Sequence, residues 1–566
     1  MRRFPARPLA AALMLATLAL PSAPARAQAP PVTEDGAKAL AAALKDGLAR
    51  WFPKGKDGAS EMRWTGDPVA TPAGDHYEVA LPALTAVSDD GTTADIGTIR
   101  LTVKPQGGNT HAVTATLPDR VTVLNKGKPS ATISLGGQRL AGVWSDAHNR
   151  ILSIDGELRD LSVVSDEKDG KGKKKEESLT IGTVTMTGEL KPDGTSAAGS
   201  PTWSGPGALT LGNIRMTDEA KKPVLELSGF TLEGNYSRVD LARSDALERL
   251  AQTHAKAGTE PSVAELLPLV RGLVAGGGYR IALNGLSATN PQDNTRIGIG
   301  QFVLHGAMQD LDKPMASSSF GFQAAGLSLE PELAPKSFMP EKLDLQFSIA
   351  NVPTDSVWRA FADLAALAEK KAAEEESEEE SDGVTKGVIA GKSEEEYEEA
   401  DLSDEEDGEE SAGALFDDPE LLAIGNRLMG AMAAVGTELR VDRFLINTPA
   451  TSGSITGALR MAANAAFGTV GGYTMELTGL DTAAKAMQPK PGKKADEETQ
   501  QALGVIAMLQ AMGQASKDAA GKDVRTYKID VTESGQLLLN GADMSALMGM
   551  GGTAPDSAPA PAAKKP

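Results

Sequence analysis

The chain contains no cysteine, which excludes disulfides, thiolate metal sites and cysteine nucleophiles. Aromatic residues are only 4% of its 566 residues, whereas there are 60 glycines and 18 methionines. A buried core must therefore be built from Leu, Ile, Val, Ala and Met, and the length allows roughly two to four domains. The formal net charge of −21 argues against a nucleic-acid-binding protein, which needs a basic face.

Motifs for catalysis and metal binding are equally scarce. The five histidines are His76, His111, His148, His254 and His305. No two of them have the spacing of metal ligands, and neither H-E-x-x-H nor G-x-S-x-G occurs. A match to S-x-x-K begins at Ser165, at the edge of a charged loop that disfavours a buried lysine. We therefore predict no metal-dependent or nucleophilic catalysis, no metal site and no cofactor.

The N-terminus has the pattern of an export signal. Three arginines within the first seven residues precede an apolar stretch from Pro8 to Leu20, and Ala25 and Ala27 form an A-x-A cleavage site. We expect a signal peptide over residues 1–27, a mature chain that begins at Gln28, and a periplasmic location. No later run reaches the ~18 apolar residues that a membrane span needs, so no transmembrane segment is expected in the mature chain.

A short strand motif recurs four times and organises the chain. Its copies begin at Ile96, Ile181, Leu211 and Ile299, and each has a glycine in second place, namely Gly97, Gly182, Gly212 and Gly300. After the glycine, apolar and mostly polar residues alternate, as in a half-buried strand. The aliphatic residue before the glycine is three positions from the next apolar one, so strict alternation would place the two on opposite faces. We predict a β-bulge or kink at each glycine, which would restore the face.

Strand patterns dominate, and helices interrupt them. We predict an α+β, β-rich fold with long antiparallel curved sheets or an open barrel, with helical inserts. The expected parts are an N-terminal helix plus antiparallel β domain over 33–240, a helical pair and second β segment over 241–368, and a C-terminal α+β segment over 412–548. Helices are expected over 33–52, 244–257, 262–275, 354–373, from 419 onward and over 496–515. Residues 549–566 form an Ala/Pro-rich tail predicted to be disordered.

An acidic tract separates two of these helices. Residues 369–410 hold 20 Asp or Glu against 4 Lys. Such a segment cannot bury a core, so residues 369–411 are predicted to be a disordered, solvated insert between two packed helices. Its carboxylates could associate weakly with divalent cations, although their spacing is not that of an EF-hand.

The signal sequence, the repeated I-G strands, the helical inserts and the closing segment from Gly535 to Gly541 together resemble exported Gram-negative envelope proteins of unknown function. The arrangement is also similar in style to AsmA-like envelope proteins, whose curved sheets offer an apolar trough to lipids. The acidic insert and the lack of a transmembrane anchor depart from that pattern. The resemblance implies an envelope location, and it assigns no catalytic residue.

Two functions remain open. The favoured one is a non-enzymatic envelope protein, a β-rich scaffold or carrier with an apolar groove for lipid or another envelope protein. The alternative is a hydrolase of envelope polymers whose paired carboxylates meet only in the fold. A groove lined continuously by Leu, Val and Met would support the first function. Two buried carboxylates about 5–10 Å apart in a cleft would support the second.

The export signal generates the first testable prediction. N-terminal sequencing of the protein from the periplasmic fraction should yield Gln28 as the first residue, because cleavage follows Ala27. Recovery of Met1 in that fraction would show that the segment is not removed.

Overall fold

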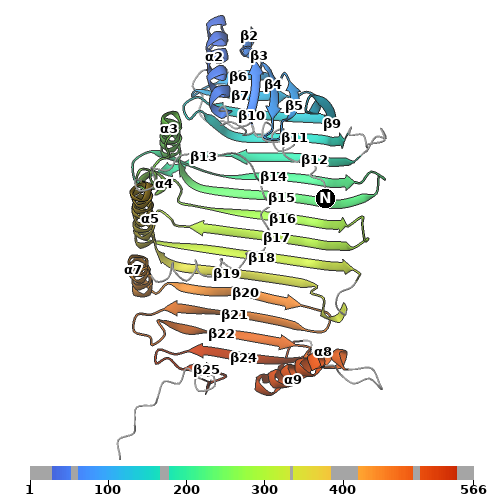
Figure 1. Cartoon of the computed structure of the whole chain (residues 1–566), viewed down its shortest axis with the longest axis vertical. Helices are drawn as coiled ribbons and strands as arrows, with labels where there is room; N and C mark the ends of the chain where they lie inside the picture. The colour runs from blue at the N-terminus through green and yellow to red at the C-terminus, as the bar shows by residue number, and fades with distance from the viewer. Residues whose placement is uncertain are drawn as a thin grey trace, which may run out of the picture.

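The chain forms one long antiparallel sheet with helices along its margins, as the computed structural model shows (Figure 1). The structure describes residues 29–52, 61–165, 177–331, 336–383, 418–488, 497–519 and 521–544. The predicted signal peptide with Ala25, Ala27 and Gln28, most of the acidic tract and the C-terminal tail lie outside these residues. The prediction of a β-rich α+β fold with a long antiparallel sheet is confirmed, and the sheet stays open.

The main body of the sheet is a meander in which each long strand pairs with the next. Its strands are β11 (Arg150–Ser165), β12 (Ser178–Glu189), β14 (Pro201–Thr217), β15 (Pro223–Asp240), β16 (Gly276–Thr289), β17 (Arg296–Gln309), β18 (Met315–Glu330), β19 (Lys342–Pro353), β20 (Glu438–Asn447), β21 (Ser452–Met461), β22 (Thr469–Thr478) and β24 (Asp523–Val531). Four short strands pair at its margins: β13 (Lys191–Thr195), β23 (Gln514–Lys517), β25 (Leu537–Leu539) and β26 (Ala542–Asp543).

At the N-terminal end the sheet forks at β11. Its first part pairs with β10 (Gly137–Ser145), and its last residues pair with β9 (Lys128–Ser134). The branch from β10 continues through β7 (Thr110–Thr116), β6 (Arg100–Gln106), β3 (His76–Ala80) and β2 (Val69–Ala73). The branch from β9 continues through β8 (Arg120–Asn125), β5 (Thr92–Gly97), β4 (Ala83–Val87) and β1 (Glu61–Thr65).

The two branches enclose the largest hydrophobic core. Leu84 and Val184 are fully buried in it, and Val123 is only 1% exposed. Helix α2 (Glu34–Trp51) packs against this core through Leu40 and Leu44. Thr33 caps the helix by accepting a hydrogen bond from the backbone N–H of Gly36, which satisfies one of its free donors.

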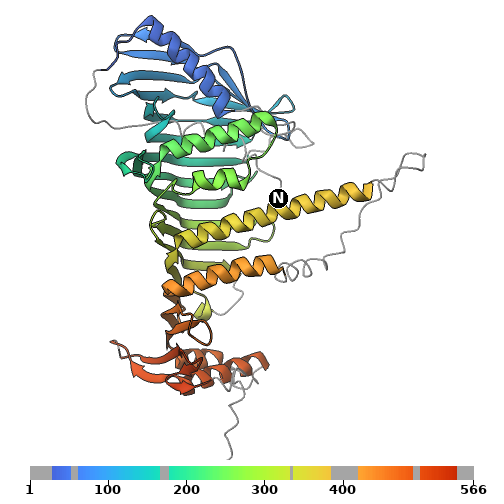
Figure 2. The same cartoon turned by 90° about the vertical axis from the view of Figure 1, so that its left-hand side faces the viewer.

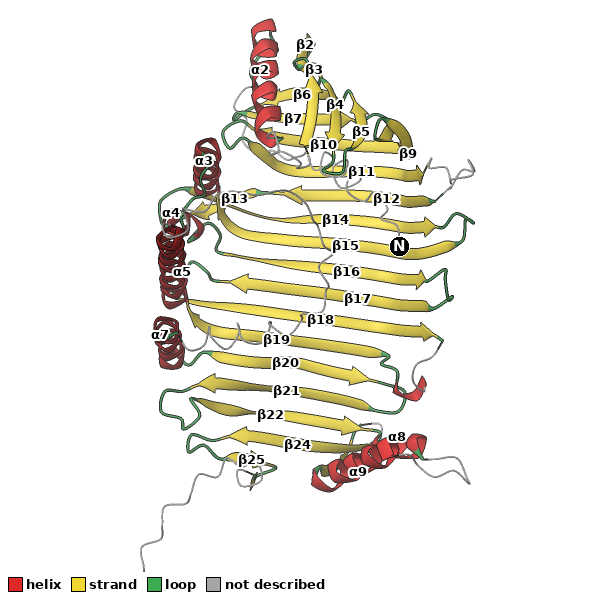
Figure 3. Cartoon of the chain, viewed as in Figure 1, coloured by secondary structure: helices red, strands yellow, loops and turns green. Residues whose placement is uncertain are grey.

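Four helices stand in a row along one set of strand ends, and Figure 2 shows that they project from the sheet to one side. They are α3 (Leu241–Ala257), α4 (Val263–Val270), α5 (Thr354–Gly383) and α7 (Pro419–Val435). The short helix α8 (Leu480–Met487) and α9 (Glu497–Met512) lie at the C-terminal end, and the 3-10 turn η1 (Lys336–Phe338) precedes β19 (Figure 3). No helix among the described residues is long and apolar enough to cross a membrane.

The predicted start signals of two helices are confirmed. Ser262 and Glu265 form a reciprocal capping box at α4, and Asp418 accepts hydrogen bonds from two backbone N–H groups at the start of α7. Two predicted ends are wrong. Helix α4 ends at Val270 instead of residue 275, because the carbonyl of Leu273 accepts from Asp240 N and holds that segment against the sheet. Helix α9 ends at Met512 instead of residue 515, because β23 begins at Gln514.

The acidic tract also needs a correction. Helix α5 continues to Gly383, so residues 369–383 are helical and not disordered. Glu369 accepts a hydrogen bond from Val263 N, and Lys370 and Lys371 form ion pairs with Glu420 and Asp418 of α7. A helix that is already packed extends easily into residues of high helix propensity, such as Ala, Glu and Lys. Residues 384–417 lie outside the described chain.

The ladder changes at or next to each of the four motif glycines. At Gly97 the register with β4 shifts by one residue beside Ile96, and Gly97 has a φ of 80°. At the other three glycines the structure differs from the predicted β-bulge, because no extra residue is inserted. Leu161 pairs with Ile181 and Arg159 pairs with Thr183, so Gly182 and its partner are skipped while the register is kept. The same interruption crosses all strands from β11 to β18, through Asp160, Gly182, Asn213, Ser228, Gly285, Gly300 and Gly326.

We call this row of skipped residues the crease. In alternate strands its members have left-handed backbones, with φ values of 52° at Asp160, 55° at Asn213, 63° at Gly285 and 66° at Gly326. Side-chain alternation reverses across the crease in every strand at once. Ile181 and Val184 are three residues apart, and both are buried on the same face. Three of the four copies of the motif, those with Gly182, Gly212 and Gly300, therefore mark the crease in the sequence.

The crease generates the second prediction. Replacing Asn213 by Val should lower the free energy of unfolding by ~1–2 kcal/mol, because a left-handed backbone is costly for residues other than Gly and Asn. Asn213→Gly should not be destabilising. Thr210→Val, in the regular ladder of the same strand, is the matched control. Urea denaturation measures all three, and equal stability of the Val and Gly variants would contradict the role of the left-handed backbone.

Candidate functional site: an apolar trough

The strand register gathers apolar side chains on one face of the sheet, which we call the apolar face. One row on this face crosses ten successive strands from β14 to β24 with a large apolar residue or tyrosine in each. The row is Leu209, Leu232, Ile281, Leu304, Phe322, Leu345, Phe444, Ile455, Met475 and Tyr527. Directly opposed residues lie side by side on one face, so this row is a continuous apolar track.

The other face is polar. Glu233, Arg280 and His305 are directly opposed on β15, β16 and β17, and Gln346 and Arg443 are opposed further along. Asp344 on this face is only 1% exposed, and Arg443 Nη1 lies 3.2 Å from its carboxylate. The two faces therefore differ sharply, and the apolar face is the one that needs a cover.

The apolar face is covered at its two ends. At the N-terminal end, Leu158, Val184 and Met186 lie in the core enclosed by the two branches. At the C-terminal end, Tyr527 is 1% exposed beneath α9, and its hydroxyl donates a 2.6 Å hydrogen bond to the carbonyl oxygen of Leu509. Helix α9 packs on the apolar face. In Figure 2 the row from α3 to α7 projects to the same side of the sheet as α9, so the helix row also stands on the side of the apolar face.

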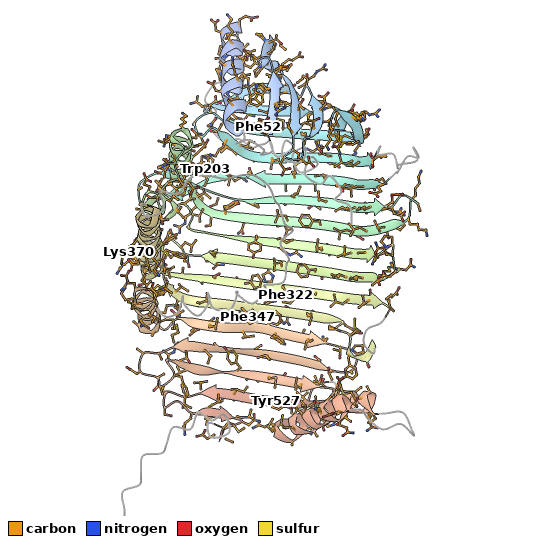
Figure 4. The ribbon with its side chains drawn as sticks, in the orientation of Figure 1. Phe52, Trp203, Phe322, Phe347, Lys370 and Tyr527 are labelled. Atoms are coloured by element: carbon orange, nitrogen blue, oxygen red, sulfur yellow. The ribbon has the colours of Figure 1, made fainter. Side chains whose placement is uncertain are left out.

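Between these ends, large apolar side chains on the same face remain exposed to solvent. Tyr236 is 58% exposed, Met308 56% and Phe320 45%. They line a cavity of about 700 Å³ together with Leu209, Leu232 and Tyr279. Phe322 and Phe347, labelled in Figure 4, lie on the adjacent strands β18 and β19 of the same face.

Glycines keep part of this cavity open. Gly207, Gly234 and Gly306 lie in a second row of the apolar face, which also holds Tyr279. A Cβ on Gly306 would lie 2.7 Å from the ring of Tyr279, so only glycine lets the ring rest there. The row therefore combines an aromatic ring with strand positions that have no side chain.

The helix row adds a second apolar surface. Ala360 and Leu367 of α5 pack against Ile424 of α7 in a small buried cluster. Phe361 and Leu364 lie about a quarter-turn further around α5. Leu364 is 38% exposed, so the apolar surface of α5 extends beyond its contact with α7.

Helix α7 likewise has apolar side chains outside its contact with α5. Leu422 and Met429 are 48% and 54% exposed, and Phe361 on α5 is 56% exposed. We use the name trough for the middle of the apolar face, where exposed apolar side chains surround the cavity of about 700 Å³, and the helix row beside it carries exposed apolar side chains of its own.

The histidines singled out in the sequence do not come together. His76 pairs with Asp75, His254 lies 3.4 Å from Glu265, and His305 lies on the polar face. His148 stacks edge-on against Trp203 with ring centroids 5.3 Å apart, and burial lowers its pKa. No group of three potential metal ligands occurs among the described residues.

Two buried carboxylates are present, but each has a structural partner. Asp240 caps α3 by accepting hydrogen bonds from Ala242 N and Arg243 N. Asp344 lies among Gln323, Gln346 and Arg443 on the polar face. Neither is among the residues that line the cavities described here, and Ser165 is a strand residue at the end of β11. The paired-carboxylate site of a hydrolase therefore has no support among the described residues.

No protein-family model matches the chain, and no match is found among the curated proteins or the solved structures. The fold and the trough define the class of this protein as an open antiparallel sheet with one apolar and one polar face. Its function is therefore argued from the geometry of the trough.

The closed C-terminal end of the trough generates the third prediction. Tyr527→Phe removes the hydroxyl that donates to the carbonyl oxygen of Leu509. Because that carbonyl also accepts from Gly513 N, the free energy of unfolding should fall by ~0.5–1.5 kcal/mol. Hydrogen exchange of the α9 amides should accelerate accordingly. Tyr473→Phe removes a hydroxyl from the same face, on the neighbouring strand β22, and should leave the α9 amides protected from exchange. Equal exchange in the two variants would show that the contact does not hold α9.

Proposed function

We propose that this is an exported, non-enzymatic envelope protein that holds lipid acyl chains in the trough. The observation that carries the proposal is the apolar track, which runs over ten strands between two covered ends and is flanked in its middle by exposed large side chains such as Tyr236, Met308 and Phe320. Soluble proteins rarely expose contiguous apolar patches of this kind unless the patch binds something. Covering it would stabilise the complex by ~25 cal/mol for each Å² of apolar surface removed from water.

The dimensions of the trough suit lipids. The nine strands from β14 to β22 are separated by eight intervals of ~4.8 Å, which gives a track of ~38 Å. This exceeds the ~30 Å thickness of the hydrocarbon core of a bilayer, in which two lipids meet tail to tail. The track therefore has room for more than one acyl chain along its length.

The chemistry of the walls also favours acyl chains. Leu, Ile, Met and Phe predominate, and methionine adapts its shape to varied apolar partners. Most residues that line the cavity are apolar or glycine, which is a surface suited to acyl chains and not to a polar polymer or a sugar. A lipid carrier or scaffold needs this kind of surface, which is apolar, long and unspecific in shape.

The fourth prediction tests the trough with a matched pair of double variants. Phe320 and Phe347 are directly opposed on the apolar face of β18 and β19. On the polar face of the same two strands, Ser317 is opposed to Gln309 and Ser348 to Arg440, and neither serine lines the cavity. Phe320→Asp with Phe347→Asp should weaken binding of a fluorescent phospholipid at least about tenfold, because acyl chains cannot compensate a desolvated carboxylate. Ser317→Asp with Ser348→Asp adds the same charge to the same two strands and should leave affinity within about twofold.

Native mass spectrometry of protein purified from its own cells completes the test. We expect a co-purified lipid that is lost in the apolar-face variant and retained in the polar-face variant. Equal effects of the two double variants, or a wild-type chain that binds no lipid, would reject the proposal. A co-purified protein in place of lipid would assign the trough to a protein partner.

A further inference from the structure

A second cavity lies under α2, at the N-terminal end of the sheet. It has a volume of about 380 Å³, which is within the range of pockets that enclose one small molecule. Helix α2 contributes Leu40 and Leu44, and the sheet contributes Leu101, Val103 and Val113. Trp144 completes a lining that is mostly apolar, so the cavity suits an apolar ligand.

One histidine and one aspartate in the lining of this cavity contact each other. His111 on β7 lines the cavity, and its Nε2 lies 2.7 Å from Oδ2 of Asp146. A carboxylate only accepts hydrogen bonds, so Nε2 carries the hydrogen and donates it. The other ring nitrogen, Nδ1, is buried and has no hydrogen-bond partner among the described residues.

An unpaired buried nitrogen of this kind is unusual. Buried polar atoms nearly always have a partner, and leaving one without costs ~1–3 kcal/mol. In the neutral ring fixed by Asp146, Nδ1 is an acceptor. It therefore selects a ligand that brings a hydrogen-bond donor, such as a hydroxyl group.

The charged residues around the cavity narrow the choice of ligand further. Asp46 and Asp146 both line the cavity, and its lining residues include neither lysine nor arginine. Arg150, close by in the chain, is engaged with Ser244 and Asp245 of α3. A fatty-acid carboxylate would meet two negative charges and no cation, whereas a neutral hydroxyl would meet an acceptor.

We propose that this cavity is a separate binding site for a neutral, long-chain alcohol. The hydroxyl donates to His111 Nδ1, and the alkyl chain lies against Leu40, Val103 and Val113. This inference does not depend on lipid binding in the open trough. Helix α2 contributes to the lining of the cavity, and the group that recognises the ligand is a single ring nitrogen.

The fifth prediction uses three probes that share one chain length. They are dodecan-1-ol, its methyl ether, which lacks the donor, and dodecanoate, which is charged. Calorimetric titration of the wild-type chain should show the alcohol binding about tenfold more tightly than either of the others, a difference of ~1.4 kcal/mol. Equal affinities, or tighter binding of dodecanoate, would overturn the proposal without any variant.

Variants then test whether His111 is the source of the preference for the alcohol. His111→Phe removes the acceptor and should bring the alcohol and the ether to the same affinity. His76→Phe alters a histidine that pairs with Asp75 outside the cavity and should keep the preference. The double variant Phe320→Asp with Phe347→Asp should also keep it, which separates this site from the trough. A preference that survives His111→Phe would contradict the assignment.

Discussion

The structure depends on one constraint, which is that an apolar sheet face must be removed from water. The chain meets this constraint in different ways along its length. At the N-terminal end, the fork at β11 produces two branches that fold over the face and bury Leu84 and Val184 completely. At the C-terminal end, α9 closes over Tyr527. Among the described residues, the stretch between them has a helix row beside it but no layer over it, and this is why Tyr236, Met308 and Phe320 stay exposed.

The opposite face shows how polar and charged side chains are satisfied on the other side of the sheet. Its central strands place Asp344 beside Arg443 and two glutamines, which satisfy a nearly buried carboxylate. Paired charges such as Glu233 and Arg280 lie directly opposite each other and avoid like-charge contacts. Apolar and polar side chains are thus separated onto two faces by strict alternation, and the crease preserves this separation where alternation alone would lose it.

Local features of this fold could be predicted from the sequence, because their causes are local. The alternation after Gly182 and Gly300 indicates strands, and the capping residues Ser262 and Asp418 fix where helices begin. The parity break in the motif indicates a disturbance at each glycine. The coordinated form of that disturbance could not be predicted, since it requires seven residues on seven strands to come into register, and register is a property of pairing between distant segments.

The candidate site was also hidden for a physical reason. The track from Leu209 to Tyr527 exists only when ten strands are aligned, because each strand contributes only one of its members. The pairing of His111 with Asp146 joins residues 35 positions apart through the β7–β10 ladder. The helical extent of the acidic tract was missed because composition describes solvation, whereas the ion pairs of Lys370 and Lys371 depend on where α7 lies.

The meander has a consequence for how the chain can fold. From β11 onward each long strand finds its partner in the next one, so most contacts of the body join segments that are near in sequence. Such a structure can grow by adding one hairpin at a time to an existing edge, much as repeat proteins propagate from a nucleus. The forked N-terminal core, made first during synthesis, offers the only multilayered core among the described strands for this growth to start from. A nascent chain of this kind would lengthen its sheet strand by strand as it emerges.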